Sequence, residues 1–118
     1  MFNHPALLRQ LNLCAEQLRR AGESDWSRRV LAAGDQVRRS GWTETGKVAV
    51  DLLFSADPGL DSVLFGAEHE RRLGGPVGVA DANGRMSELR DRLKQLAAYP
   101  LRQALAPGAP RQRSPDLG

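Results

Sequence analysis

The chain has 118 residues, of which 41% are hydrophobic and 26% charged, and it carries a formal net charge of +3. This length suits one domain with one core, and the composition predicts a folded chain rather than a disordered one. The longest apolar runs, such as VLF and LLF, are far too short to cross a bilayer, and the N-terminus lacks the pattern of a signal peptide. We therefore expect a cytoplasmic protein that does not enter a membrane, and its single cysteine, Cys14, excludes an intramolecular disulfide.

The first predicted helix covers residues 5–21 and carries one apolar stripe. Pro5 lies in its first turn, where the missing N–H costs nothing, and Gly22 favours the left-handed conformation that often ends a helix. Apolar residues recur at spacings of four and three, which is typical of an amphipathic helix. They are Leu7, Leu11, Cys14, Leu18 and Ala21.

A second helix is predicted over residues 24–39, with Ser24 as a candidate cap and Asp25 adding favourable charge in the first turn. Its apolar positions are again spaced by four, three and four, and they comprise Trp26, Val30, Ala33 and Val37. The tryptophan therefore belongs to the core stripe rather than to a recognition surface. Because the connection is short, the two helices are expected to form an αα-hairpin.

A third helix is predicted over residues 44–54, although Gly46 weakens it by roughly 1 kcal/mol. Residues 55–59 form a cluster of turn formers. The following segment, LDSVLF at residues 60–65, fits either a short extended stretch or a short helix. Both alternatives stay open from the sequence.

Residues 67–80 contain three glycines and no sustained apolar period, which predicts a long surface loop. A last helix is predicted over residues 81–98, with Asp81 as its cap and Pro100 stopping or bending it. Its apolar stripe consists of Met86, Leu89, Leu93 and Leu96.

The expected architecture is all-α, a compact bundle of about four helices that begins with the αα-hairpin. Residues 1–99 form its single domain. Residues 100–118 contain four prolines and few large apolar residues, which predicts a flexible tail.

The sequence offers little support for an enzyme or a metal centre. His4, His69 and Cys14 are far apart and lack the spacing of metal ligands, and a cysteine on an apolar stripe is usually a small buried hydrophobe. The segment GGPVG at residues 74–78 lacks the lysine and the preceding strand of a phosphate loop. We therefore expect no catalytic residues, no cofactor and no metal.

Three arginine pairs on the first two predicted helices suggest an alternative function in nucleic-acid binding or regulation. They are Arg19, Arg20, Arg28, Arg29, Arg38 and Arg39. Acidic residues are interleaved with them, which favours a solvated, salt-bridged helix surface instead. An aromatic content of 5% also leaves few platforms for stacking bases.

The region from Glu44 to Glu70 has six acidic residues and one basic residue, Lys47, a formal charge of −5 that leaves +8 on the remainder. These carboxylates either pair with arginines of neighbouring helices or form a negative surface for a basic partner. The candidate partner-binding residues are Asp57, Asp61, Glu68, His69 and Glu70, with Trp42 as a candidate aromatic anchor. The alternative for Trp42 is that it packs the bend between the second and third helices.

Three segments, LLRQLNLCAEQLRRAGESDWSRRV, GLDSVLF and ADANGRMSELRDRLKQLA, together resemble a family of small bacterial helical domains of unknown function. Members of that family look like candidate immunity proteins of polymorphic toxin systems. The similarity spans residues 7–98, and within it Leu60, Asp61 and the run 63–65 fit the family pattern. The resemblance implies a cytoplasmic, non-enzymatic protein that binds and neutralises a co-encoded toxin, and it carries over no catalytic residues.

Overall fold

The computed structural model describes the backbone of residues 4–105 and the side chains of residues 4–98. This part of the chain is helical and contains no β-strand, which confirms the all-α fold. Its elements are α1 (Pro5–Arg20), α2 (Ser24–Ser40), α3 (Glu44–Ser55), η1 (Leu60–Ser62), η2 (Ala67–His69), α4 (Glu70–Leu73) and α5 (Gly75–Leu105).

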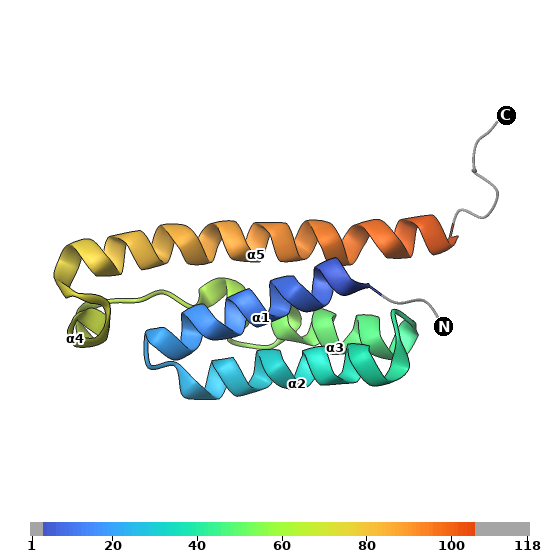
Figure 1. Cartoon of the computed structure of the whole chain (residues 1–118), viewed down its shortest axis with the longest axis horizontal. Coiled ribbons are helices and arrows are strands. Elements are labelled where there is room, and N and C mark those ends of the chain that lie inside the picture. The colour runs from blue at the N-terminus through green and yellow to red at the C-terminus, as the bar shows by residue number, and fades with distance from the viewer. Residues whose placement is uncertain (1–3, 106–118) are drawn as a thin grey trace, which may run out of the picture.

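Helix α1 lies at the centre of the bundle. It packs against α2 on one side and α5 on the other, and α3 packs against α2 at the edge (Figure 1). The turn between α1 and α2 and the short helix α4 lie at one end of the molecule, whereas the turn between α2 and α3 lies at the other (Figure 1). Because the two turns lie at opposite ends of the bundle, they cannot belong to one binding surface.

The predicted hairpin of α1 and α2 is confirmed, and both apolar stripes are buried. Gly22 has a φ of 90°, the left-handed conformation expected after α1. The prediction that Ser24 caps α2 is wrong. Because Glu23 takes the cap position, Ser24 is already helical, and no side chain caps this helix by a hydrogen bond.

The turn between α2 and α3 explains why a glycine stands inside the third helix. A Cβ atom on Gly46 would lie 2.5 Å from the carbonyl oxygen of Gly41, closer than real Cβ contacts come. Gly46 therefore allows α3 to start close against the end of α2. The helix propensity lost at this position is the cost of that close approach.

The prediction of a long loop over residues 67–80 is wrong, because these residues form η2, α4 and the beginning of α5. Gly74 and Gly75 have φ values of 90° and 87° and reverse the chain between α4 and α5. Asp81 consequently lies inside α5 and does not cap it. The buried Ala82 and the partly buried Val79 extend the stripe of Met86 backwards at spacings of four and three.

At its other end α5 also departs from expectation. The helix continues past Pro100 to Leu105, although we expected it to stop or bend at the proline. Residues 106–118 of the predicted tail lie outside the described residues.

The segment left open by the sequence, residues 60–65, starts with η1 and continues without helix. Side chains of α5 satisfy its backbone. The Asn83 amide accepts a hydrogen bond from Phe65 N at 2.8 Å and donates one to Phe65 O at 2.9 Å. Arg90 donates to Val63 O at 2.9 Å. These hydrogen bonds satisfy backbone N–H and C=O groups that would be paired within a regular helix.

Candidate functional site

Trp42 is part of the core and not an exposed anchor. Its side chain is 6% exposed and meets the ring of His4 edge to face, with ring centroids 5.9 Å apart. Its Nε1 is buried and has no hydrogen-bond partner among the described residues. Of the two alternatives given by the sequence for Trp42, the structure favours packing at the bend between α2 and α3 over an exposed aromatic anchor.

His69 is also buried, with 6% of its surface exposed. The backbone N–H of Gly66 donates to its Nδ1 at 2.9 Å, so the ring hydrogen resides on Nε2. Nε2 lies 2.8 Å from Oε2 of Glu23 and donates to that carboxylate. Both ring nitrogens are thus used inside the protein, and the predicted role of His69 in contacting a partner is wrong.

Asp61 pairs with helix α5. One carboxylate oxygen lies 2.7 Å from Nζ of Lys94, and the other lies 3.8 Å from Nε of Arg90. For this residue the structure favours the pairing alternative over a free negative charge. Because half of the Asp61 side chain remains exposed, the pair contributes little to stability.

The other predicted acidic residues do not gather around Asp61. Glu68 and Glu70 belong to η2 and α4, and the segment leading into η2 is bonded to Asn83, whereas Asp61 pairs with Lys94. The helix rise places Asn83 and Lys94 roughly 16 Å apart along α5. The predicted residues therefore form no single surface, and Asp57 is exposed in the turn after α3.

A different surface combines acidic and apolar side chains. We call it the α3 face and define it by Glu44, Val48, Asp51 and Leu52, which are all exposed and follow one side of the helix. Val48 is 45% exposed and Leu52 is 58% exposed. The spacing of Val48 and Leu52 by one helical turn was visible in the sequence. In the sequence these residues resemble core positions, because α3 has few polar residues.

A shallow groove between α2 and α3 borders this face, with a volume of about 330 Å³. Most of the residues that line it are apolar or small, and Leu52 belongs to the α3 face as well. The lining residues are Arg29, Ala32, Ala33, Gln36, Ala49, Leu52 and Leu53. Lys47 bonds Asp51 within α3, so the only basic residue between Glu44 and Glu70 is used internally. The hydrogen bond to Asp51 raises the pKa of Lys47.

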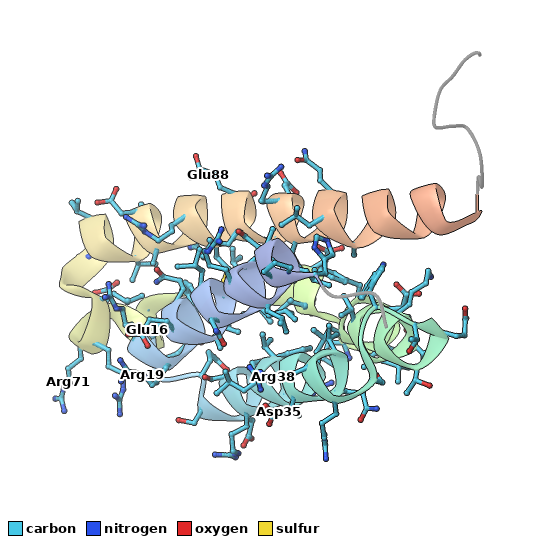
Figure 2. The ribbon with its side chains drawn as sticks, turned by 45° about the vertical axis from the view of Figure 1, so that its right-hand side comes forward. Glu16, Arg19, Asp35, Arg38, Arg71 and Glu88 are labelled. Atoms are coloured by element: carbon cyan, nitrogen blue, oxygen red, sulfur yellow. The ribbon has the colours of Figure 1, made fainter. Side chains whose placement is uncertain are left out.

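Most of the paired arginines bond carboxylates one turn away on their own helix. Nη2 of Arg19 lies 2.5 Å from Oε2 of Glu16, and Nη1 of Arg38 lies 2.5 Å from Oδ1 of Asp35 (Figure 2). Arg28 and Asp25 form a pair of the same kind. These bonds match the expected salt-bridged helix surface, and the bonds from Arg19 and Arg20 lower the pKa of Glu16.

Cys14 shows no sign of a reactive thiol. It is fully buried among the apolar side chains of α1, and this burial raises its pKa to about 12. Within residues 4–105 no three histidine, cysteine or carboxylate side chains come together as metal ligands. The helices of this part also lack any segment long and apolar enough to cross a membrane.

Comparisons with protein-family models, with curated proteins and with solved structures return no match to this chain.

Proposed function

We propose that this protein is a non-enzymatic binding protein that captures a basic protein partner on the α3 face, and that the partner is a toxin which it neutralises. The observation that carries the proposal is the exposure of Val48 and Leu52 beside Glu44 and Asp51 on one side of α3. The resemblance to candidate immunity proteins supports the choice of a toxin. The proposal places this capture in the cytoplasm.

The charge of this region suits a basic partner. Glu44 and Asp51 place two carboxylates on the α3 face, and Lys47, the only basic residue of α3, is bonded to Asp51. Glu44 and Asp57 stand near the two ends of α3 as exposed carboxylates. Complementary charge of this kind accelerates encounter with a positively charged surface and disfavours acidic partners.

The apolar part of the surface supplies the affinity that charge alone does not give. Leu52 stands at the edge of the groove between α2 and α3, and its side chain is 58% exposed. Protein interfaces commonly have an apolar centre that excludes water and a polar rim around it. Val48 and Leu52 would form this centre, and Glu44 and Asp51 the rim. Neutralisation by covering a toxin in this way requires no reaction chemistry.

Nucleic-acid binding is the weaker alternative. Arg19, Arg28 and Arg38 each bond a carboxylate of their own helix, so contact with phosphates would have to replace these pairs. Arg29 stacks instead on Trp26, with its guanidinium carbon 3.8 Å from the ring centroid.

The proposal is tested by affinity purification of the tagged full chain from its native host, followed by mass spectrometry and a nucleic-acid assay of the eluate. We expect one basic protein in stoichiometric amount that is toxic when expressed alone and harmless when expressed with this chain. The purified pair is then used to measure affinity. Leu52→Arg should weaken it at least about tenfold, because a buried apolar contact is replaced by a charge that repels the partner.

The matched control is Leu64→Arg, which places the same charge at another apolar residue that is 72% exposed. This variant should bind as the wild type does, and both variants should keep the helical circular-dichroism signal. Equal binding by Leu52→Arg and the wild type would rule out the α3 face. Recovery of nucleic acid without a protein partner would favour the arginine surfaces instead.

A further inference from the structure

A second groove lies between the end of α1, the short helix α4 and the first turns of α5. Its volume is about 390 Å³, within the range typical of small-molecule sites. Three arginines from three different helices line it, together with one glutamine and one carboxylate. These residues are Gln17, Arg20, Arg72, Asp81 and Arg85.

Gln17 is the feature that packing does not explain. Its side chain lies on α1, is only 7% exposed and borders the groove, and its amide forms no hydrogen bond with the side chains of residues 4–98 or with the described backbone. Among the described residues only Trp42 has a fully buried side-chain polar atom without a partner, so the Gln17 amide keeps contact with solvent at the groove. An amide that lines an open groove and has no partner within the described protein can form a hydrogen bond with a molecule that enters the groove.

The arginines of the groove differ in their pairing. Arg20 lies 3.2 Å from Glu16, whereas Arg72 and Arg85 have no carboxylate within 4.0 Å among the described residues. The Arg72 side chain passes close over Gly22, where a Cβ atom would lie 2.6 Å from its Cδ. Two guanidinium groups without partners thus border the groove in the part of it formed by α4 and α5.

The groove adjoins a second hollow of about 180 Å³, with which it shares Gln17, Arg20 and Arg85. This hollow is also lined by Leu13, Leu89 and Glu16, and Glu16 is bonded to Arg20. Leu13 is 47% exposed although it is a large aliphatic side chain. The apolar side chains of Leu13 and Leu89 therefore lie beside arginines that line both hollows.

We propose that this groove binds a small phosphomonoester that carries a hydrophobic ring, of the size and chemistry of a nucleoside monophosphate. Arg72 and Arg85 hold the phosphate, the Gln17 amide bonds a polar atom next to it, and the ring lies on Leu13 and Leu89. Asp81 accepts a hydrogen bond from a hydroxyl group of the ligand. This site is distinct from the α3 face and does not depend on the proposed function.

A phosphate fits this arrangement better than a carboxylate does. Its terminal oxygens point in several directions, so guanidinium groups from α4 and α5 can each donate to it, and the forked donors of arginine match it well. At neutral pH a phosphomonoester carries nearly two negative charges. Because three arginines and one carboxylate line the groove, the second charge adds more attraction than repulsion.

The test is isothermal titration calorimetry of the full chain with adenosine monophosphate, ribose 5-phosphate and adenosine, at constant ionic strength and without phosphate buffer. We expect adenosine monophosphate to bind, ribose 5-phosphate to bind more weakly because it lacks the ring, and adenosine to give no measurable heat. Failure of both phosphates to bind would overturn the site. Equal binding of adenosine and its monophosphate would overturn the role of the arginines.

Variants then locate the site. Arg72→Gln and Arg85→Gln should each weaken binding of adenosine monophosphate about tenfold or more, because each loses a charge-assisted hydrogen bond. The matched control is Arg71→Gln, since Arg71 is the neighbour of Arg72 in α4 and points away from the bundle (Figure 2). Equal affinities of Arg72→Gln and Arg71→Gln would refute the proposal.

Gln17→Met separates a binding role from a structural one. Methionine fills a similar volume without an unpaired amide, so this variant should unfold at the same temperature as the wild type or higher. It should nevertheless weaken binding of adenosine monophosphate severalfold. Unchanged affinity in Gln17→Met would show that the amide does not contact the ligand and would overturn the proposed pose.

Discussion

Nε2 of His69 donates a hydrogen bond to Oε2 of Glu23 over 2.8 Å, joining residues that lie 46 positions apart in the chain. The bond ties η2 to the turn between α1 and α2. The same imidazole accepts the backbone N–H of Gly66, and its ring packs edge to face on Phe65 with centroids 5.2 Å apart. One buried side chain therefore positions the whole segment that enters α4.

His69→Ala should lower the free energy of unfolding by about 2–3 kcal/mol, because it removes two hydrogen bonds and leaves a buried N–H of Gly66 without a partner. Unfolding in guanidinium chloride, followed by circular dichroism, measures the change. The matched control is Glu68→Gln, since the Glu68 side chain is 76% exposed and stands 3.7 Å from Nδ1 of His69. An equal loss in both variants would contradict the structural role assigned to the imidazole.

Trp42→Phe should change the free energy of unfolding by less than about 1 kcal/mol, because the loss of packing is offset by removal of a buried N–H that has no partner. Trp42→Ala should cost about 3–5 kcal/mol, since it leaves a large cavity. Urea unfolding of the two variants gives both values. The comparison is Trp26→Phe, which weakens the stacking of Arg29 on the ring. It should lower the free energy of unfolding more than Trp42→Phe does. The reverse order would show that the Trp42 N–H is bonded in solution.

The helices α1, α2 and α3 were predictable to within one residue at each end, because each has an apolar stripe bounded by a glycine or by turn formers. The stripe that runs back from Met86 to Ala82 and Val79 was also present in the sequence. We did not predict this part of the helix, because the three glycines at 74, 75 and 78 are typical of a loop. Only the positive φ values of the first two show that they form a reversal immediately before a helix.

The candidate sites were less predictable than the fold. Burial of Trp42 and His69 depends on partners such as His4 and Glu23, which local sequence patterns do not reveal. The Gln17 amide was hidden in the same way, because a glutamine beside an apolar stripe is usually solvated. A count of charges along the sequence could not show that Asp61 pairs with Lys94 or that the acidic residues are spread over several elements.

Cys14 makes the stability of the protein depend on pH in the alkaline range. Burial raises the pKa of its thiol from 9.0 to about 12, so between these values the unfolded chain releases a proton that the folded chain keeps. The contribution of the thiol to stability is therefore complete below the unfolded pKa and is lost as the pH rises toward the folded pKa. Below that interval the thiol should also resist alkylation until the protein is unfolded.

The measurement compares the wild type with Cys14→Ala. The difference in their free energies of unfolding should be constant up to a pH of about 9 and should then move against the wild type as the pH rises. Taking the difference cancels the other groups that titrate in this range. A difference that stays constant through the alkaline range would contradict the burial of the thiol.

Two glycines of α5 should respond oppositely to the same substitution. Gly84 is exposed within the helix, and a Cβ atom there would meet nothing within 4 Å, so Gly84→Ala should raise the free energy of unfolding by about 0.5–1 kcal/mol. A Cβ atom on Gly78 would lie 1.7 Å from the carbonyl oxygen of Leu73. Gly78→Ala must therefore displace the turn between α4 and α5 and should destabilise the protein. Thermal unfolding of both variants measures the contrast, and stabilisation by Gly78→Ala would mean that residues 74–78 adopt the open loop that their composition suggests.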